Sequence, residues 1–353
     1  MLAQKTFFMG QWAVFLLLLL CIPARAHDVK DPVCRMTTDT DTTPYRETVG
    51  GKTYYFCSDT CKARFDKSPQ SYMTLAQRLL HGRRSYRLVL TAPSHSAPNR
   101  PTPLSFVIRE SPSGQIVRDF EITHTKRLHF IMVSADFSWF EHQHPTLGSD
   151  GRFRLTWTFP QKGRYYLFAD FTPTDGDNQI LRTTLDIGGP GQGGLPQMTP
   201  NDSATQTIGN TRVELVRRPP IMRAGCQTVL TYTFTDLQGK QLTGMQPILG
   251  VMGHLIALRE DTQTIVHTHA LNGVQSGTYG AAMLEMMQAG QPEIVPITPD
   301  MVTLTGPSLS FKLTLPKPGR YKLWAQFQRQ NKWLTVPFTV EVLPPRDAAP
   351  GRG

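Results

Sequence analysis

One block of sequence occurs twice in the 353-residue chain. Phe159–Phe171, with the sequence FPQKGRYYLFADF, closely parallels Leu315–Phe327, with the sequence LPKPGRYKLWAQF. Three histidines lie upstream of each block, and the first two are thirteen residues apart in both cases. This agreement in residue type, interval and downstream block predicts two copies of one structural unit.

Each copy has the pattern of a series of short strands. The 28 glycines and 28 prolines favour a turn-rich, mainly β architecture over a helical bundle. About 100 residues with about seven strands are typical of an immunoglobulin-like sandwich. We therefore expect two tandem immunoglobulin-like β-sandwich domains, over 85–187 and 208–343, joined by a flexible linker, 188–207, and followed by a disordered tail, 344–353. The strands expected in the first copy are Tyr86–Leu90, Leu104–Ile108, Leu128–Val133, Phe153–Phe159, Tyr165–Phe171 and Thr183–Ile187.

The N-terminus has the pattern of a secretory signal peptide, residues 1–26. Lys5 precedes the apolar run Trp12–Ile22, and Ala24-Arg25-Ala26 is a small-residue cleavage signal. The run has only about half of the ~20 residues that a membrane span needs. We expect cleavage near Ala26, a periplasmic or secreted product without Cys21, and no integral membrane protein.

Charge and motifs exclude several classes of function. The net charge of +10 is scattered along the chain, without the basic stripe and interleaved aromatics that a nucleic-acid partner requires. The sequence has no blue-copper His-Cys-His cluster, no nucleophile elbow and no glycine-rich phosphate loop. We therefore expect neither nucleic-acid binding nor catalysis.

Three cysteines near the mature N-terminus have the spacing C-x22-C-x3-C: Cys34, Cys57 and Cys61. A strand before Cys57 and a helix over 57–80, interrupted near Pro69, place Cys57 and Cys61 at a helix start capped by Ser58 or Asp59. The helix N-terminus lowers thiol pKa values there, which favours a soft metal such as Cu(I) or zinc. Met36, His27 or a partner protein could supply a fourth ligand. The alternative is a disulfide, Cys57–Cys61 or Cys34–Cys61.

The same segment resembles the YHS domain, one of the TRASH-type metal-binding modules. The matching motifs are Asp31-Pro32-Val33-Cys34-Arg35-Met36 and Gly51–Cys57, followed by Phe65 and Pro69-x-x-Tyr72. Arg35 departs from the glycine usual in that family. The resemblance implies a small α+β, treble-clef-like knuckle over 28–81, which binds copper or other soft metals through Cys34, Cys57 and Cys61.

Two further triads of histidines are expected to lie on hairpins. His142 and His144 share one face of a strand, and a turn near Asp136-Phe137 brings His129 opposite one of them. The equivalent residues of the second copy are His254, His267 and His269. Each triad predicts a Cu(II) or Zn(II) site on an inner or partly buried face. The alternative is that the histidines brace the hairpin through Asp136, Glu141 or backbone groups, and a one-residue slip would turn His129 away.

The two copies differ at two positions near the triads. Copy one has His124 and Asp170 where copy two has Leu249 and Gln326, so we expect copy one to be the stronger site. Val133–Pro145 and Gly319–Trp324 also resemble repeats of exported bacterial proteins that accompany heavy-metal-binding modules. Copy two has a methionine cluster that we interpret as an apolar packing helix, Met283, Met286, Met287 and Met301, and Cys226 is expected to be a small buried residue.

These features predict a periplasmic heavy-metal-binding protein without catalytic activity. It would bind copper, or else zinc, in sequestration, resistance or hand-over to a metal efflux or assembly protein. The alternative is a non-catalytic scaffold or adhesion module of the cell envelope with a structural zinc knuckle.

Overall fold

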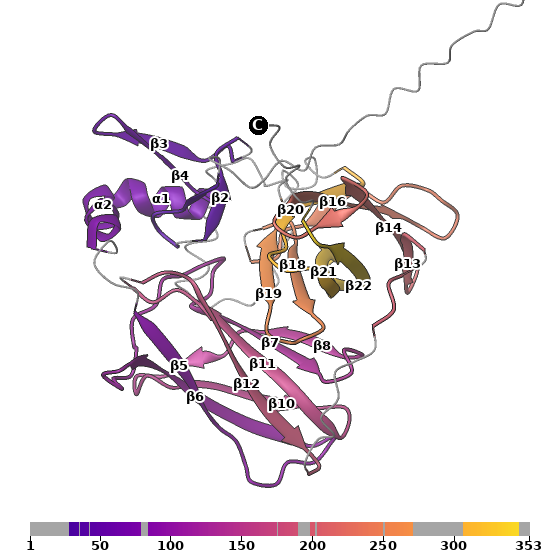
Figure 1. Cartoon of the computed structure of the whole chain (residues 1–353), viewed down its shortest axis with the longest axis horizontal. Coiled ribbons are helices and arrows are strands. Elements are labelled where there is room, and N and C mark those ends of the chain that lie inside the picture. Colours follow the sequence, from indigo (N-terminus) through magenta and orange to yellow (C-terminus); the bar gives the residue numbers. More distant parts are fainter. Residues whose placement is uncertain are drawn as a thin grey trace, which may run out of the picture.

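The computed structural model describes residues 28–345, with gaps at 35, 42, 79–83, 175, 190–197, 202, 250 and 271–305. A knuckle and two β-sandwiches follow one another along the chain (Figure 1). The expected leader, His27, Arg35, Gly82, the methionine cluster, part of the linker (190–197 and 202) and most of the tail lie outside the described residues. Within the described part, no helix has the length and apolarity needed to cross a membrane.

The knuckle combines two small antiparallel sheets with two helices. Strands β1 (Asp28–Lys30) and β2 (Thr37–Asp39) form one sheet, and β3 (Arg46–Val49) and β4 (Lys52–Tyr55) form the other. Helix α1 (Asp59–Lys67) is capped by Ser58, whose hydroxyl accepts a hydrogen bond from the Cys61 amide at 3.2 Å. Helix α2 (Pro69–Arg78) follows directly, so the predicted interruption at Pro69 is confirmed.

Copy one is a sandwich of two four-stranded sheets. The first has the order β5 (Ser85–Thr91), β6 (Pro101–Ser111), β10 (Phe153–Thr158) and β9 (Thr146–Leu147). The second has the order β12 (Gln179–Ile187), β11 (Gly163–Phe171), β7 (Leu128–Ser134) and β8 (Phe140–Gln143). Phe106 stacks on Phe130 and on Phe153, with ring centroids 4.8 and 5.3 Å apart, so both sheets contribute to one core.

Copy two has the same layered plan. One sheet has the order β13 (Thr205–Ile208), β14 (Thr211–Arg218), β16 (Gln227–Thr235) and β20 (Ser308–Thr314). The other has the order β15 (Met222–Arg223), β22 (Lys332–Leu343), β21 (Gly319–Arg329), β18 (His254–Arg259) and β19 (Ile265–His269), and β17 (Met245–Gln246) pairs with β21. The fold class expected from the sequence, mainly β with two tandem sandwiches after a small knuckle, is confirmed.

A tyrosine corner occurs in both copies. Tyr165 donates a hydrogen bond from its hydroxyl to the Gln161 carbonyl at 2.8 Å, and Tyr321 donates to the Lys317 carbonyl at 2.9 Å. Both rings are fully buried. This contact near the start of a strand is a hallmark of immunoglobulin-like sandwiches, and its repetition supports two copies of one unit.

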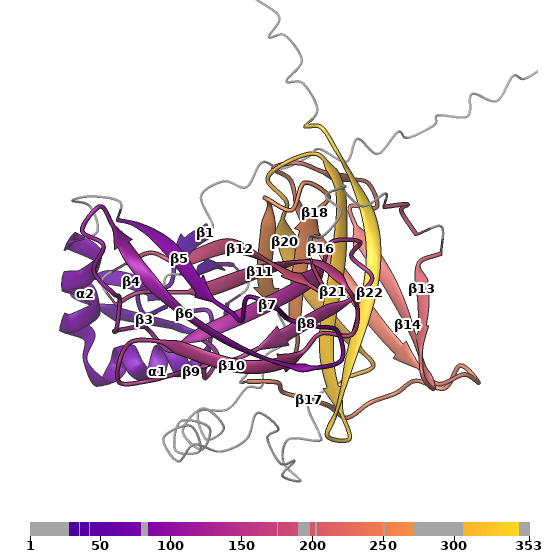
Figure 2. The same ribbon diagram turned by 90° about the horizontal axis from the view of Figure 1, so that it is seen from below.

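The histidine-bearing faces of β7 and β18 pack against each other rather than inside their own sandwiches. Ile131 and Val133 of copy one share an apolar cluster with Ile256 and Leu258 of copy two. Figure 2 shows β7 and β8 beside β21. The expected inner face is therefore buried, but between the copies, because the alternate residues of β7 (Phe130 and Met132) already fill the core of copy one.

The knuckle contacts both copies. The Thr172 hydroxyl, just after β11, donates to the Cys34 carbonyl at 2.8 Å, and Arg64 pairs with Glu121 at 2.9 Å. On the other side, Lys312 of β20 forms an ion pair with Asp39. These contacts place the three cysteines close to the end of the interface between the copies.

Candidate metal centres

The three knuckle cysteines converge on one point, which we call the thiolate centre. The Cys57 sulfur lies 3.3 Å from that of Cys34 and 3.8 Å from that of Cys61, and all three cysteines are free. Neither disulfide that the sequence left open is present. Two thiolates bound at ~2.3 Å to one tetrahedral ion lie about 3.8 Å apart, so the spacing suits a shared soft metal ion.

Asp31 completes this cluster and was not foreseen as a site residue. Its ligand atom lies within 4.8 Å of those of all three cysteines. One carboxylate oxygen accepts from the amide of Val33 at 2.7 Å, and the other accepts from the amide of Cys57 at 2.7 Å. Burial, and then the neighbouring Cys61, raise the pKa of Asp31 to about 8. Asp31 therefore ties the two cysteine-bearing loops together, and a nearby cation would favour its charged form.

The thiol pKa values correct one expectation. Hydrogen bonds from Cys34 and Cys57 hold the pKa of Cys61 well below its ordinary value. Donation toward Cys34 and Cys61 raises the pKa of Cys57, and burial raises the pKa of Cys34. The expected lowering at both Cys57 and Cys61 is therefore wrong for Cys57, because its proton stabilises the neighbouring sulfurs. One thiolate with two thiol donors is ready for an ion that displaces their protons.

The hairpin register brings the first histidine triad together. Ile131 pairs with His142 and Val133 with Phe140, which sets His129 opposite His144. The Nδ1 atom of His129 lies 3.1 Å from Nε2 of His142 and 3.2 Å from Nε2 of His144. The one-residue slip that would have turned His129 away is absent.

Copy two repeats the arrangement for its first two histidines. His254 pairs with His269 across β18 and β19, and its Nδ1 atom lies 3.2 Å from Nε2 of His267. His269 lies beside both, but its ring contacts His124 of copy one, with centroids 3.7 Å apart. The ligand atoms that lie within 4.8 Å of one another belong to His254, His267 and His129 of copy one.

The two expected sites are therefore parts of one cluster between the copies. We call this cluster the histidine centre and define it as His129, His142, His144, His254 and His267. Rings of opposite copies lie 5.3 Å apart for His142 and His254, and 5.2 Å apart for His142 and His267.

Hydrogen bonds of the outer nitrogens fix where the protons of this centre lie. His129 and His254 place Nε2 against the carbonyls of Thr123, at 3.0 Å, and Ile248, at 3.2 Å. A carbonyl only accepts, so each Nε2 carries the proton and each Nδ1 carries a lone pair.

The second histidine of each pair is fixed by a residue of the opposite copy. His267 donates from Nδ1 to the Asp170 carboxylate at 2.7 Å, and His142 donates from Nδ1 to the Gln326 side-chain oxygen at 3.0 Å. When the two rings are neutral, their Nε2 atoms therefore also carry lone pairs. The expectation that Asp170 strengthens its own copy is wrong, because its carboxylate partners the second copy.

When all four rings are neutral, two pairs of lone-pair nitrogens face each other, His129 with His142 and His254 with His267. Nitrogens bound at ~2.0–2.1 Å to one tetrahedral ion lie about 3.3 Å apart, close to the spacing of both pairs. Burial holds the pKa values of His129, His142 and His254 well below 6.5, so these rings are neutral at neutral pH. The arrangement suits a cation at each pair.

The hairpin-bracing alternative is only partly met. Asp136 accepts hydrogen bonds from Ser134 and Ser138, and Glu141 accepts one from Gln143 at 3.2 Å. The histidine rings instead contact Thr123, Ile248, Gln326, Asp170 and one another. The backbone contacts of that alternative are present, to the carbonyls of Thr123 and Ile248. They use the outer ring nitrogens and leave the nitrogens that face each other available to a cation. Cys226 is buried, as expected.

Comparison with known families agrees with this division into a metal-binding knuckle and a two-copy unit. Residues 29–76 match the YHS domain. Residues 83–189 and 206–343, most of the chain, match a family described as a domain of unknown function, DUF8832. The chain belongs to this DUF8832 family. The YHS match together with the cysteine and histidine clusters indicates a metal-binding protein.

Individual relatives cover less. A copper-transporting P-type ATPase of Rhizobium leguminosarum bv. viciae is 44% identical over 46 residues, which are 13% of this chain and 6% of the ATPase. Among solved structures, a tetra-tandem repeat of a large adhesion protein is 11% identical over 73% of this chain and 50% of that one, with a TM-score of 0.22. Salmonella alpha-2-macroglobulin is 10% identical over 74% of this chain and 15% of that one, with a TM-score of 0.23. Scores this low support no further conclusion.

Proposed function

We propose that the protein is an exported, non-catalytic copper-binding protein that sequesters the ion or hands it to an efflux or assembly partner. The observation that carries the proposal is the pair of facing imidazole nitrogens in each copy, 3.1 and 3.2 Å apart, on rings whose other nitrogens lie against hydrogen-bond acceptors. With neutral rings and no cation bound, two lone pairs at this distance repel each other. Such a geometry is favourable when an ion lies between them.

The combination of ligands favours copper or zinc over hard ions. Three thiolates select Cu(I) or zinc over hard ions, and imidazole accepts both copper and zinc. The ATPase whose segment resembles the knuckle is named for copper transport, which supports copper here. The leader-like N-terminus supports export to an envelope compartment.

The test is metal analysis of the mature chain and three variants. Replacing Cys57 and Cys61 by Ser should remove the thiolate-bound ion, and replacing His142 and His144 by Ala should remove a histidine-bound ion. Each change should leave the other centre filled. Exposed His95→Ala is the matched control, with unchanged metal content. A scaffold with a structural zinc knuckle instead predicts zinc at the cysteines and no metal lost with the histidines.

A further inference from the structure

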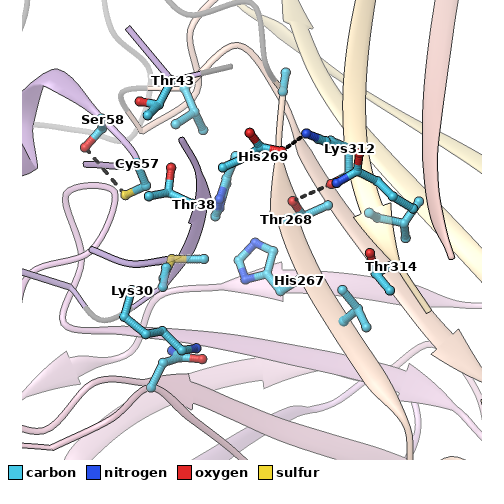
Figure 3. A pocket seen from close by; sticks show the side chains of 18 of the residues that line it. Lys30, Thr38, Thr43, Cys57, Ser58, His267, Thr268, His269, Lys312 and Thr314 are labelled. Atoms are coloured by element: carbon cyan, nitrogen blue, oxygen red, sulfur yellow. Dashed lines mark hydrogen bonds and ion pairs between the residues drawn. The ribbon is translucent and has the colours of Figure 1, made fainter. Parts of the chain in front are cut away.

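A cavity of about 490 Å³ connects the two centres. Its lining includes Met36 and Cys57 of the knuckle and His267 and His269 of β19. Figure 3 shows the Cys57 side chain on the knuckle side of this space and the two histidines reaching into it from β19. The lining also includes exposed Lys30, so the cavity reaches the protein surface. The histidine centre behind it is buried, with His129 and His142 each 2% exposed.

His269 lines this cavity, and His124, which lies outside the cavity lining, packs against the His269 ring. The rings of His124 and His269 are 3.7 Å apart, and they come from different copies. Their Nε2 atoms are buried and have no hydrogen-bond partner within the part of the chain that the structure describes. A buried polar atom without a partner costs free energy, so it calls for a ligand.

The backbone holds His124 in place. His124 and Thr125 both have positive φ, 45° and 71°, in a tight turn that is closed by two hydrogen bonds between Thr123 and Lys126. Residues other than glycine adopt this backbone region rarely. Copy two makes the same turn with Leu249, at φ 52°, so the turn does not itself require a histidine.

His124 also lies between the two centres. Its ring is 6.4 Å from that of His129 and 6.1 Å from that of His254. On the other side, the segment just before His124 contacts helix α1, where Arg64, one turn after Cys61, donates to the Ile122 carbonyl at 3.0 Å. A sequence of ligands therefore runs from sulfur, through the His124–His269 pair, to the buried nitrogens.

We propose that His124 and His269 form an intermediate station through which Cu(I) passes between the thiolate centre and the histidine centre. Each step is a ligand exchange, in which a copper–sulfur bond breaks and a copper–nitrogen bond forms, and copper stays monovalent throughout. The inference rests on the proposed copper-binding function and adds the route and the residues of transfer within one chain.

The test compares the mature wild-type chain with His124→Leu, which copies the residue that the same turn holds in copy two. Cu(I) is added anaerobically in excess over both centres. Rapid freezing and copper X-ray absorption then give sulfur and nitrogen ligation against time. In His124→Leu the final ratio should be unchanged, while nitrogen ligation should appear about tenfold more slowly, equivalent to about 1.4 kcal/mol in the barrier. Cys57→Ser should also slow it, and His95→Leu should not.

Three outcomes would overturn the station. His124→Leu could fill the histidines as fast as wild type, or lose nitrogen-bound copper at equilibrium, which would make His124 a permanent ligand. The histidine centre could also fill as fast in Cys57→Ser as in wild type, which would show that copper reaches it by a route that bypasses the thiolate centre. A wild-type chain that binds copper at neither centre would instead refute the proposed function, and the absence of both signals identifies that case.

Discussion

The two copies place the same pair of histidines on the same hairpin, yet they differ in the residue that each offers to the other. Copy one supplies a carboxylate, Asp170, to His267, whereas copy two supplies an amide, Gln326, to His142. Both contacts cross the interface, as expected when two similar faces meet around an approximate two-fold axis. Each pair of histidines is therefore completed by the opposite copy.

This difference means that sequence similarity between the copies does not imply equal sites. A carboxylate behind an imidazole raises the basicity of the ligand nitrogen more than a neutral amide does. The pair His254/His267 should therefore bind a cation more tightly than the pair His129/His142. That order is the reverse of the one predicted from the sequence.

The largest expected effect comes from removing one histidine of a pair. His267→Ala should abolish the ion held in copy two, because it leaves His254 without its partner. His142→Ala should only weaken the ion in copy one, because His144 stays 3.2 Å from His129. Metal content after exhaustive dialysis gives the stoichiometry. Loss of all histidine-bound metal in either single variant would show one shared ion rather than two.

The second prediction concerns pH and the metal-free chain. Burial lowers the pKa of His124 from 6.5 to about 4, so folding opposes its protonation. As pH falls, His124 of the unfolded chain is protonated before His124 of the folded chain. The contribution of neutral His124 to the free energy of unfolding is therefore complete above pH ~6.5 and is lost as pH falls toward ~4. The loss from this one group is about 3 kcal/mol at pH ~4.

Copy two provides the matched variant for that measurement, since His124→Leu removes the titrating ring from the same turn. Urea unfolding midpoints between pH 7 and 4 should fall less steeply in this variant than in wild type. Equal slopes in the two proteins would mean that His124 is solvated and titrates normally.

The third prediction tests the asymmetry of the interface directly. Asp170→Asn gives both pairs a neutral partner and should weaken metal binding at His254/His267 by about 10–100-fold. Competition with a chelator, in a background with both His142 and His144 replaced by Ala, measures the affinity of this pair. Asp170 also accepts a hydrogen bond from Asn178 at 2.7 Å, so Asn178→Ala serves as a control for loss of that contact alone.

Much of each half-site could be predicted from the sequence because strand periodicity is local. The thirteen-residue spacing and a turn near Asp136 place His129 and His142 on one face, and the structure has that register. The three cysteines likewise converge because a strand delivers Cys57 to a capped helix start. Local periods and caps are sufficient for these groupings.

The joining of the half-sites could not be predicted in this way. The contact between His267 and Asp170 spans 97 residues and depends on how two separately cored sandwiches pack. No period in the sequence encodes that packing. Asp31 was missed for a related reason, since only the fold shows that this motif residue is fully buried against the sulfurs.

The smallest and most specific expected effect comes from Gln326→Glu. Gln326 is 4% exposed, and its oxygen lies 3.0 Å from Nδ1 of His142. A carboxylate there would copy the Asp170 contact and should tighten cation binding at His129/His142 by up to about tenfold, measured in a His267→Ala background. The metal-free protein should become less stable, because a buried charge with a neutral neighbour is unfavourable. Combined with Asp170→Asn, the change keeps the net charge and should exchange the affinities of the two pairs. If the order of affinities stays as in wild type, the partner across the interface does not set it, and the ranking must come from His144, which lies 3.2 Å from His129 in copy one while its counterpart His269 turns to His124.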